Sequence, residues 1–233
     1  MQAGADRATP SRLRLGRRCL TASVAALAVA RQARADAGQA ALNLPRGNAI
    51  GFRILRDGSE VGTHRVAFDR RGDTTVVQVA IDIAVTYGWI TMFRFTHRAV
   101  ETWQGERFSG IGSHTDENGR AAWMRTVPDP GGALLVSGSG TVPYAAPPGA
   151  LASTYWNPAI LGAPVISSQD GRLSAPRVEA GPLEPVPCVG GTVQARRHDM
   201  HGDRDLQIWY DLDDQWAHFR FQRDGSLITY LRT

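Results

Sequence analysis

The feature of this sequence that most restricts its fold is a hydrophobic period of two residues, interrupted at intervals by turn dipeptides. In residues 74–87 the large apolar side chains occupy alternate positions, which places them on one face of an extended strand. Tight turns between antiparallel strands are favoured by four dipeptides, namely Asp57-Gly58, Asn118-Gly119, Asp170-Gly171 and Asp224-Gly225. Together these patterns predict an antiparallel β protein built from hairpins.

The number of predicted strands favours a curled sheet. The turn spacing implies about eleven or twelve strands, which is more than one flat sheet holds comfortably. We therefore predict a single all-β domain over residues 49–233, an antiparallel meander curled into a barrel or half-barrel. A sandwich of two sheets is the alternative. Between Pro128 and Pro187 the alternation weakens and proline is frequent, which indicates an irregular crossover.

The crossover contains the string STYWNPAILG, residues 153–162, which predicts a short turn of helix. Pro158 suits the first helical position, where its missing N–H costs nothing, and Asn157 suits the N-cap. The turn presents Trp156 toward one end of the curled sheet. Trp156 is therefore predicted to act either as a plug, packed fully against the sheet, or as a lid over a cavity.

Residues 1–35 have the pattern of an export signal. Several arginines come before an apolar run of 12 residues, and an A-x-A cleavage site ends at Ala35. The run is shorter than the roughly 20 residues of a membrane-spanning helix, so no transmembrane anchor is expected. The pair Arg17 and Arg18 favours twin-arginine export, with an ordinary secretory signal as the alternative. We predict cleavage after Ala35, a flexible mature N-terminus at residues 36–48, and a periplasmic location.

The net charge of the chain depends on this signal. It holds seven of the 26 basic residues and one of the 22 acidic residues, which leaves 19 basic against 21 acidic residues in the remainder, a net charge of −2. A slightly acidic chain has no electrostatic attraction for nucleic acid, so no nucleic-acid partner is expected. Cys188 is the one cysteine after the signal, and no internal disulfide is possible.

Hairpin turns also predict which residues stand opposite one another. Around the turn at 224–225, Phe221 is expected to face Ile228, and the preceding hairpin is expected to pair Tyr210 with Ala217. Near Gly88 the apolar pattern requires a loop of odd length, because only then do the inward residues of 81–85 meet Phe93 and Phe95. In residues 92–125, two-residue turns at 105–106 and 118–119 place His97 opposite His114.

The register of residues 92–125 yields the candidate site. One inward face of these strands gathers aromatic, basic and acidic side chains: Phe95, His97, Glu101, Trp103, His114, Trp123 and Arg125. Such a face predicts a pocket in which Arg125 and the histidines receive the polar or anionic head of a ligand, while the aromatic residues and Trp156 hold its apolar body. The alternative is a structural network in which Glu101 forms a buried ion pair with Arg125.

Metal and catalytic chemistry receive little support. His97 and His114 supply two possible metal ligands in the predicted register, but Glu101 lies about 13 Å along the strand from His97. No metal or other cofactor is therefore predicted. The sequence contains no G-x-S-x-G motif, no glycine-rich phosphate loop and no dinucleotide-binding fingerprint.

Three hypotheses for function follow, in order of preference. The first is a periplasmic protein that binds an apolar or amphipathic molecule, or a lipid-bearing partner, in its concave face. The second is a structural or assembly protein of the cell envelope with a solid core. The third is an enzyme that uses the same histidine-rich face.

Several strings taken together resemble one family of exported bacterial proteins. In chain order they are VGTHRV, FTHRAVETWQG, SHTDENG, STYWNP, DLQIWYD and GSLITYL. They are similar to a domain of unknown function that is marked by the strings YWN and WYD, and the resemblance extends from about Ile50 to Leu231. It implies a curled β-sheet with an irregular insert and an exported location, and it assigns no catalytic residue.

Overall fold

The computed structural model describes residues 42, 44, 45 and 47–233. The predicted export signal at residues 1–35 lies outside this part of the chain, as does most of the predicted flexible segment 36–48. Both therefore stay predictions. The described residues form one unit, and its first strand begins at Ala49.

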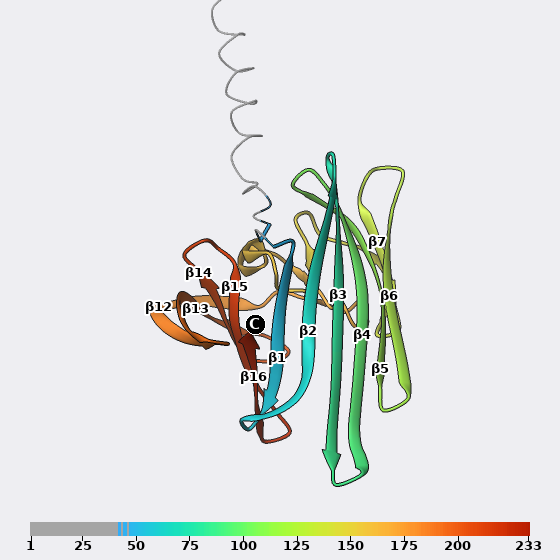
Figure 1. The fold of residues 1–233 in the computed structure, drawn as a ribbon. Helices are drawn as coiled ribbons and strands as arrows, with labels where there is room; N and C mark the ends of the chain where they lie inside the picture. Colours follow the sequence, from blue (N-terminus) through green and yellow to red (C-terminus); the bar gives the residue numbers. More distant parts are fainter. Residues whose placement is uncertain (1–41, 43, 46) are drawn as a thin grey trace, which may run out of the picture. The chain divides into compact units, whose positions relative to one another are not determined.

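Thirteen strands of the described residues form one antiparallel sheet, in the order β12-β13-β14-β15-β16-β1-β2-β3-β4-β5-β6-β7-β8 (Figure 1). Their bounds are β1 Ala49–Arg56, β2 Ser59–Arg71, β3 Thr74–Tyr87, β4 Ile90–Gln104, β5 Arg107–Glu117, β6 Arg120–Pro128, β7 Leu134–Gly138, β8 Thr141–Ala145, β12 Arg177–Cys188, β13 Gly191–His201, β14 Leu206–Asp211, β15 Trp216–Arg223 and β16 Ser226–Arg232. The edge strands β12 and β8 are not paired with each other, so the curled sheet stays open. This confirms the predicted all-β half-barrel.

The crossover between β8 and β12 passes along the concave side of the sheet (Figure 1). It contains three short strands, which pair in the order β11-β10-β9, and one 3-10 helix. Their bounds are β9 Leu151–Ala152, η1 Pro158–Gly162, β10 Val165–Ile166 and β11 Leu173–Ser174. As predicted, Asn157 caps the helix, and its side-chain oxygen accepts a hydrogen bond from the Ala159 backbone N–H at 3.0 Å. No helix in the described part of the chain combines the length and the apolar character needed to cross a bilayer.

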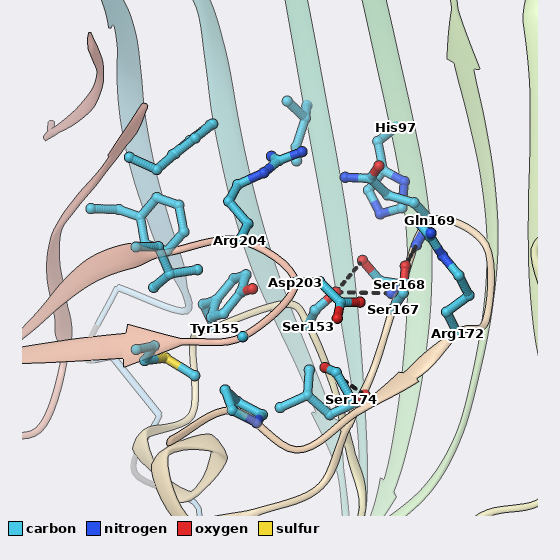
Figure 2. A pocket seen from close by; sticks show the side chains of 18 of the residues that line it. His97, Ser153, Tyr155, Ser167, Ser168, Gln169, Arg172, Ser174, Asp203 and Arg204 are labelled. Atoms are coloured by element: carbon cyan, nitrogen blue, oxygen red, sulfur yellow. Dashed lines mark hydrogen bonds between the residues drawn. The ribbon is translucent and has the colours of Figure 1, made fainter. Parts of the chain in front are cut away.

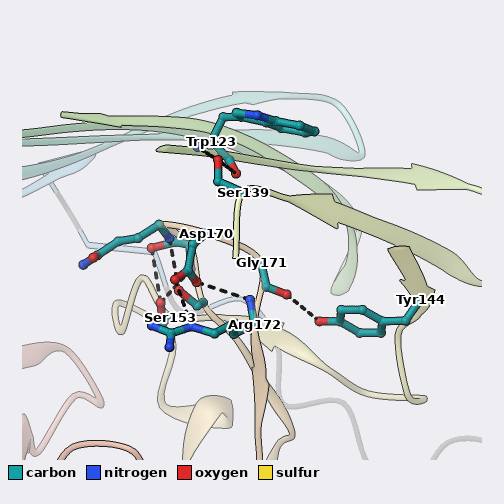
Figure 3. A network of polar contacts seen from close by, with 10 residues as sticks. Trp123, Ser139, Tyr144, Ser153, Asp170, Gly171 and Arg172 are labelled. Carbon is teal, nitrogen blue, oxygen red and sulfur yellow. Dashed lines mark hydrogen bonds and ion pairs between the residues drawn. The ribbon is translucent and has the colours of Figure 1, made fainter. Parts of the chain in front are cut away.

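A hydrogen bond and a close backbone contact tie the crossover to the strands β7 and β8 at one edge of the sheet. The Tyr144 hydroxyl on β8 donates to the Gly171 carbonyl oxygen at 2.9 Å, as Figure 3 shows. Close to that contact, the backbone of Gly138 approaches Asp170 so tightly that a Cβ at this glycine would lie 2.2 Å from the Asp170 carbonyl oxygen. Because no side chain fits there, Gly138 allows the crossover to touch the sheet.

Two of the predicted registers are confirmed. In one of them the odd offset comes from a β-bulge and not from an odd-length loop. Phe221 pairs with Ile228, as expected from the turn at 224–225. Val85 pairs with Phe93, as the apolar pattern required, but the turn has two residues, and a β-bulge at Met92 supplies the odd offset. In the preceding hairpin the prediction is wrong, because a bulge makes Tyr210 pair with Trp216 in place of Ala217.

A further bulge, between β4 and β5, overturns the register on which the candidate site was based. Trp103 pairs with Phe108 as predicted, but Thr102 then pairs with Gly110, which leaves Ser109 as an extra residue in β5. The bulge turns the Ile111 backbone N–H toward the Thr126 hydroxyl of β6, which accepts its hydrogen bond at 2.9 Å. Because side chains alternate with a period of two, one extra residue sends the rest of the strand to the opposite face.

The consequence is that half of β5 and β6 is turned over relative to the prediction. His97 pairs with Thr115, not with His114. His114 therefore lies on the convex, solvent-exposed side, and so do Trp123 and Arg125, whose pairing with β5 was otherwise predicted correctly. The expected inward cluster containing His114, Trp123 and Arg125 is thus wrong.

Candidate functional site

A pocket of about 340 Å³ lies on the concave side of the sheet, between the strands, the crossover and the loop that joins β13 to β14 (Figure 2). Its walls differ in chemistry. Strands β2 and β4 contribute histidines, the crossover contributes serine, glutamine and arginine side chains, and strands β14 to β16 contribute an apolar and aromatic surface. The pocket is therefore amphipathic.

His64 and His97 belong to one row of the sheet. His64 on β2 pairs with Ile81 on β3, and Ile81 pairs with His97 on β4, so both imidazoles point into the pocket from the concave face. The two side chains are buried, with 4% and 2% of their surfaces exposed. Thr115 forms a hydrogen bond with His97 Nδ1 at 2.8 Å. Within the described residues, His97 Nε2 and both ring nitrogens of His64 have no hydrogen-bond partner.

The electrostatic state of these histidines follows from their burial. Loss of solvation lowers the pKa of His64 to about 3, with a smaller contribution from His97, and lowers the pKa of His97 to about 4, with a smaller contribution from Arg98. Both rings are neutral near pH 7. Each neutral imidazole carries one N–H donor and one acceptor nitrogen, and most buried polar atoms in proteins have a partner. Unused hydrogen-bonding capacity therefore lies in the pocket wall on both sides of Ile81, on nitrogens that are themselves buried.

The crossover forms the polar wall. Ser153 Oγ accepts a hydrogen bond from the Ser168 backbone N–H at 2.9 Å, which holds two segments of the crossover together beside His97 (Figure 2). Ser167 and Gln169 line the same side. Arg172 is the charged residue of this wall, and its Nε lies 2.9 Å from an Asp170 carboxylate oxygen.

The opposite wall is apolar. Its side chains come from β14 to β16 and the end of β13, and they are Met200, Leu206, Trp216, Phe219, Phe221 and Tyr230. Arg204, from the loop between β13 and β14, extends along this wall with its guanidinium carbon 5.2 Å from the centre of the Phe221 ring. No carboxylate of the described residues lies within 4.0 Å of Arg204. An exposed cation thus borders the aromatic surface.

Tyr155 closes the pocket from the crossover side. It has a backbone φ of 62°, a left-handed conformation that is uncommon for a bulky residue. The Tyr155 carbonyl oxygen accepts a hydrogen bond from the Tyr210 hydroxyl at 2.7 Å, and the Tyr155 ring lies 5.0 Å from that of Phe219. Burial raises the pKa of Tyr155 to about 12, so the phenol is neutral. This strained residue positions an aromatic ring over the pocket while its neighbour Trp156 turns away into the core.

Trp156 and Glu101 form a separate, closed cluster next to the pocket. Glu101 is 1% exposed, and one of its carboxylate oxygens accepts hydrogen bonds from Trp156 Nε1 at 2.9 Å and Trp103 Nε1 at 3.0 Å. The other oxygen accepts from the Thr154 hydroxyl at 2.5 Å. The expected ion pair between Glu101 and Arg125 is therefore wrong. Burial raises the pKa of the Glu101 carboxyl, and the three hydrogen bonds act in the opposite direction.

The predicted site residues thus separate into three groups. His97 lines the pocket, and Phe95 stacks on it with ring centres 6.5 Å apart. Glu101, Trp103 and Trp156 are buried in the core, where Trp156 is a plug and not a lid. The third group is exposed on the convex side and consists of His114, Trp123 and Arg125.

Several pocket residues were missed at the level of sequence. His64 was available from the pattern, because it alternates with the inward-facing Val66 and Phe68 of the same strand. Arg172, Arg204 and Tyr155 carried no such signal, since they lie in irregular segments where no period applies. Among the described residues, no group of three or more His, Cys, Asp or Glu side chains could hold a metal ion.

Comparisons with known proteins agree with this fold. The model of the family described as Domain of unknown function (DUF6134) matches residues 52–233. A crystal structure of a beta-barrel-like protein of domain of unknown function DUF1849 from Brucella abortus has a TM-score of 0.54 and 9% sequence identity, and covers 79% of this chain and 94% of that one. At that identity the likeness concerns the fold alone. No curated protein sequence matches the chain. The chain therefore belongs to the DUF6134 family of domains of unknown function.

Proposed function

We propose that this protein is exported to the periplasm and binds a small amphipathic molecule in the concave pocket. The observation that carries the proposal is the pairing of unused imidazole nitrogens on His64 and His97 with an aromatic wall across one cavity. Small-molecule sites are typically apolar cavities in which a few convergent polar groups orient the ligand. The pattern of residues 1–35, which predicts an export signal, supports the periplasmic location.

The chemistry of the pocket defines the class of ligand. Neutral histidines and serine hydroxyls offer hydrogen bonds. Arg204 supplies positive charge at the pocket wall beside the Asp203 carboxylate, while Arg172 is paired with Asp170. These groups suit a carboxylate or another acidic or hydroxylated head group, and the aromatic wall suits an apolar body. The volume of about 340 Å³ lies at the lower end of the range for ligand pockets. We therefore propose a ligand with a single apolar chain or ring system, smaller than a two-chain lipid.

This pocket also bears on the second hypothesis. A structural protein with a solid core has interior side chains packed as closely as an organic crystal, with few voids larger than a water molecule. A cavity of about 340 Å³ bordered by unpartnered polar atoms does not match that description. The ligand-binding hypothesis accounts for both features.

A fluorescent fatty acid such as cis-parinaric acid tests the proposal directly. The wild-type protein is expected to bind the probe and enhance its emission. Ser167→Trp is expected to weaken binding by at least about tenfold, because the added ring fills the pocket beside the crossover and removes space for the chain. The measurement is a fluorescence titration of purified protein from which the signal has been removed.

The matched control is Ser59→Trp, which adds the same ring at the exposed first residue of β2, outside the pocket. It is expected to bind the probe as the wild type does. His64→Phe replaces the imidazole with a slightly larger ring that has no hydrogen-bonding nitrogens, so it should weaken binding of the acid more than binding of the corresponding hydrocarbon. Equal probe binding by the wild type and Ser167→Trp would contradict the assignment of the pocket.

A further inference from the structure

The hairpin formed by β3 and β4 extends beyond the rest of the sheet. Pairing of β3 with β2 ends at Ile83, and pairing of β4 with β5 ends at Phe95. Residues 84–94 therefore form a two-stranded ribbon that has no neighbouring strand among the described residues. At its base the Arg94 backbone is hydrogen-bonded to Asn118 in the turn between β5 and β6, and at about 3.3 Å per residue the ribbon projects roughly 13 Å. Figure 1 shows its turn reaching past the neighbouring turns at the same end of the sheet. We call residues 84–94 the projecting ribbon.

The tip of the projecting ribbon is strongly apolar and exposed. Tyr87 is 83% exposed, Trp89 93%, Ile90 52% and Met92 65%. No charged residue occurs between Asp82 and Arg94. Single exposed apolar residues are ordinary, but four within six positions form a patch of the kind that marks an interaction site. An isolated two-stranded ribbon is also only marginally stable in water. Contact of its apolar tip with another apolar surface would stabilise it.

We propose that the projecting ribbon inserts its tip into the surface of a phospholipid bilayer. The tip is convex, so it suits a deformable apolar medium. Trp and Tyr are the residues enriched at membrane interfaces, where the ring is buried and its polar group stays near water. Gly88, with a φ of 60°, makes the tight turn that places Trp89 at the apex.

The charges behind the tip complement lipid phosphate. Arg94 is the first charged residue on β4 and is exposed, and no carboxylate of the described residues lies within 4.0 Å of its guanidinium. Counted back from the tip along β3, the first charged residue is Asp82, which forms an ion pair with Arg98 at 2.7 Å. The base of the projecting ribbon therefore presents an unpaired cation about 7 Å behind Met92, at the depth of the head groups when the apolar tip is inserted.

The projecting ribbon is also continuous with the pocket. Ile83 and Val85 lie on the same face of β3 as Ile81, which lines the pocket, and they pair with Phe95 and Phe93 of β4. This apolar row offers a path along which a chain taken from the bilayer reaches the pocket. The path rests on the proposed function, whereas the membrane contact does not require any ligand in the pocket.

Binding to vesicles of phosphatidylethanolamine and phosphatidylglycerol tests the inference. The protein without its signal is expected to sediment with these vesicles, with a blue shift of its tryptophan emission as Trp89 leaves water. Trp89→Ser is expected to lower the partition coefficient by about tenfold and to abolish the shift, because one large apolar side chain no longer enters the bilayer. Arg94→Gln is expected to lower it about fivefold on these vesicles and not on phosphatidylcholine vesicles, since only anionic lipid attracts the cation.

Leu212→Ser is the matched control, because Leu212 is 74% exposed at the turn between β14 and β15, outside the projecting ribbon. It should bind vesicles as the wild type does. Failure of the wild-type protein to bind, or equal binding by Trp89→Ser and Leu212→Ser, overturns the membrane contact and leaves a protein partner for the ribbon. Titration of the same variants with cis-parinaric acid separates the two proposals, since Trp89→Ser leaves the pocket intact.

Discussion

Replacing Glu101 with alanine is expected to lower the free energy of unfolding by about 3–5 kcal/mol. The carboxylate is the common acceptor for Trp103, Trp156 and Thr154, and all four side chains are buried. Its removal leaves two indole N–H groups and a hydroxyl without an acceptor, and it creates a cavity at the same place. Because Thr154 and Trp156 belong to the crossover, the loss should also loosen the crossover from the sheet.

The matched control is Glu101→Gln. Its amide oxygen accepts from both indoles, while its NH₂ group donates to the Thr154 hydroxyl, which lies within 3.5 Å of the Ala152 carbonyl oxygen as an alternative acceptor. The glutamine variant should therefore lose about 1 kcal/mol or less. Urea unfolding followed by tryptophan fluorescence measures both variants. Similar losses for alanine and glutamine would show that the hydrogen-bonded network contributes little.

The same pair of proteins reports the ionisation of Glu101. Burial raises the pKa of this carboxyl in the folded state, so the folded protein binds its proton more tightly than the unfolded chain does. The stability of the wild type relative to Glu101→Gln is therefore greatest below about pH 4.5, the pKa of the unfolded chain, and falls as the pH rises through the folded pKa. Unfolding curves of both proteins at several pH values follow that difference.

The extent to which the fold could be predicted depended on how local its determinants are. The alternation of apolar residues in 74–87 depends on neighbours two positions apart, and β3 has the bounds that the pattern predicted. The turn at 224–225 likewise determined the pairing of Phe221 with Ile228. Both features are decided within a few residues, so a single sequence contains the information.

The bulges could not be predicted in the same way. The extra residue at Ser109 is associated with a hydrogen bond from Ile111 to Thr126 on the next strand, which no local pattern reveals. Its effect is large, because it moves His114 and every later inward position of β5 to the other face. The hydrogen-bond partners of Glu101 could not be predicted for a related reason, since Thr154 and Trp156 lie more than fifty residues away in an irregular segment.

A shift from pH 7 to pH 5 is expected to destabilise the folded protein by several kcal/mol, through three buried histidines. Burial lowers the pKa of His64 to about 3, and that of His97 and His218 to about 4, with smaller effects of neighbouring groups. In the unfolded chain each histidine titrates near pH 6.5. Below that pH the unfolded chain binds protons that the folded protein does not, so stability falls as the pH falls.

The magnitude follows from the free energy of one pKa unit, about 1.4 kcal/mol. At pH 5 each histidine is about 1.5 units below its unfolded pKa, which corresponds to about 2 kcal/mol per residue and about 6 kcal/mol for the three. Glu101 acts in the opposite direction, because its raised pKa favours the folded state in acid. Even when Glu101 offsets part of it, a loss of several kcal/mol is comparable with the whole stability of many domains, about 5–15 kcal/mol.

Single substitutions assign this acid sensitivity to its sources. His218 packs with its ring 5.0 Å from that of Trp209, away from the pocket, so His218→Phe should reduce the slope of stability against pH by about 1.4 kcal/mol per unit between pH 6.5 and 4 without affecting probe binding. His114→Gln serves as the control, because it replaces a histidine that is exposed on the convex side of the sheet. Urea midpoints at pH 7, 6 and 5 measure the slopes. If the two variants retain equal slopes, protonation of the His218 imidazole does not contribute to acid unfolding.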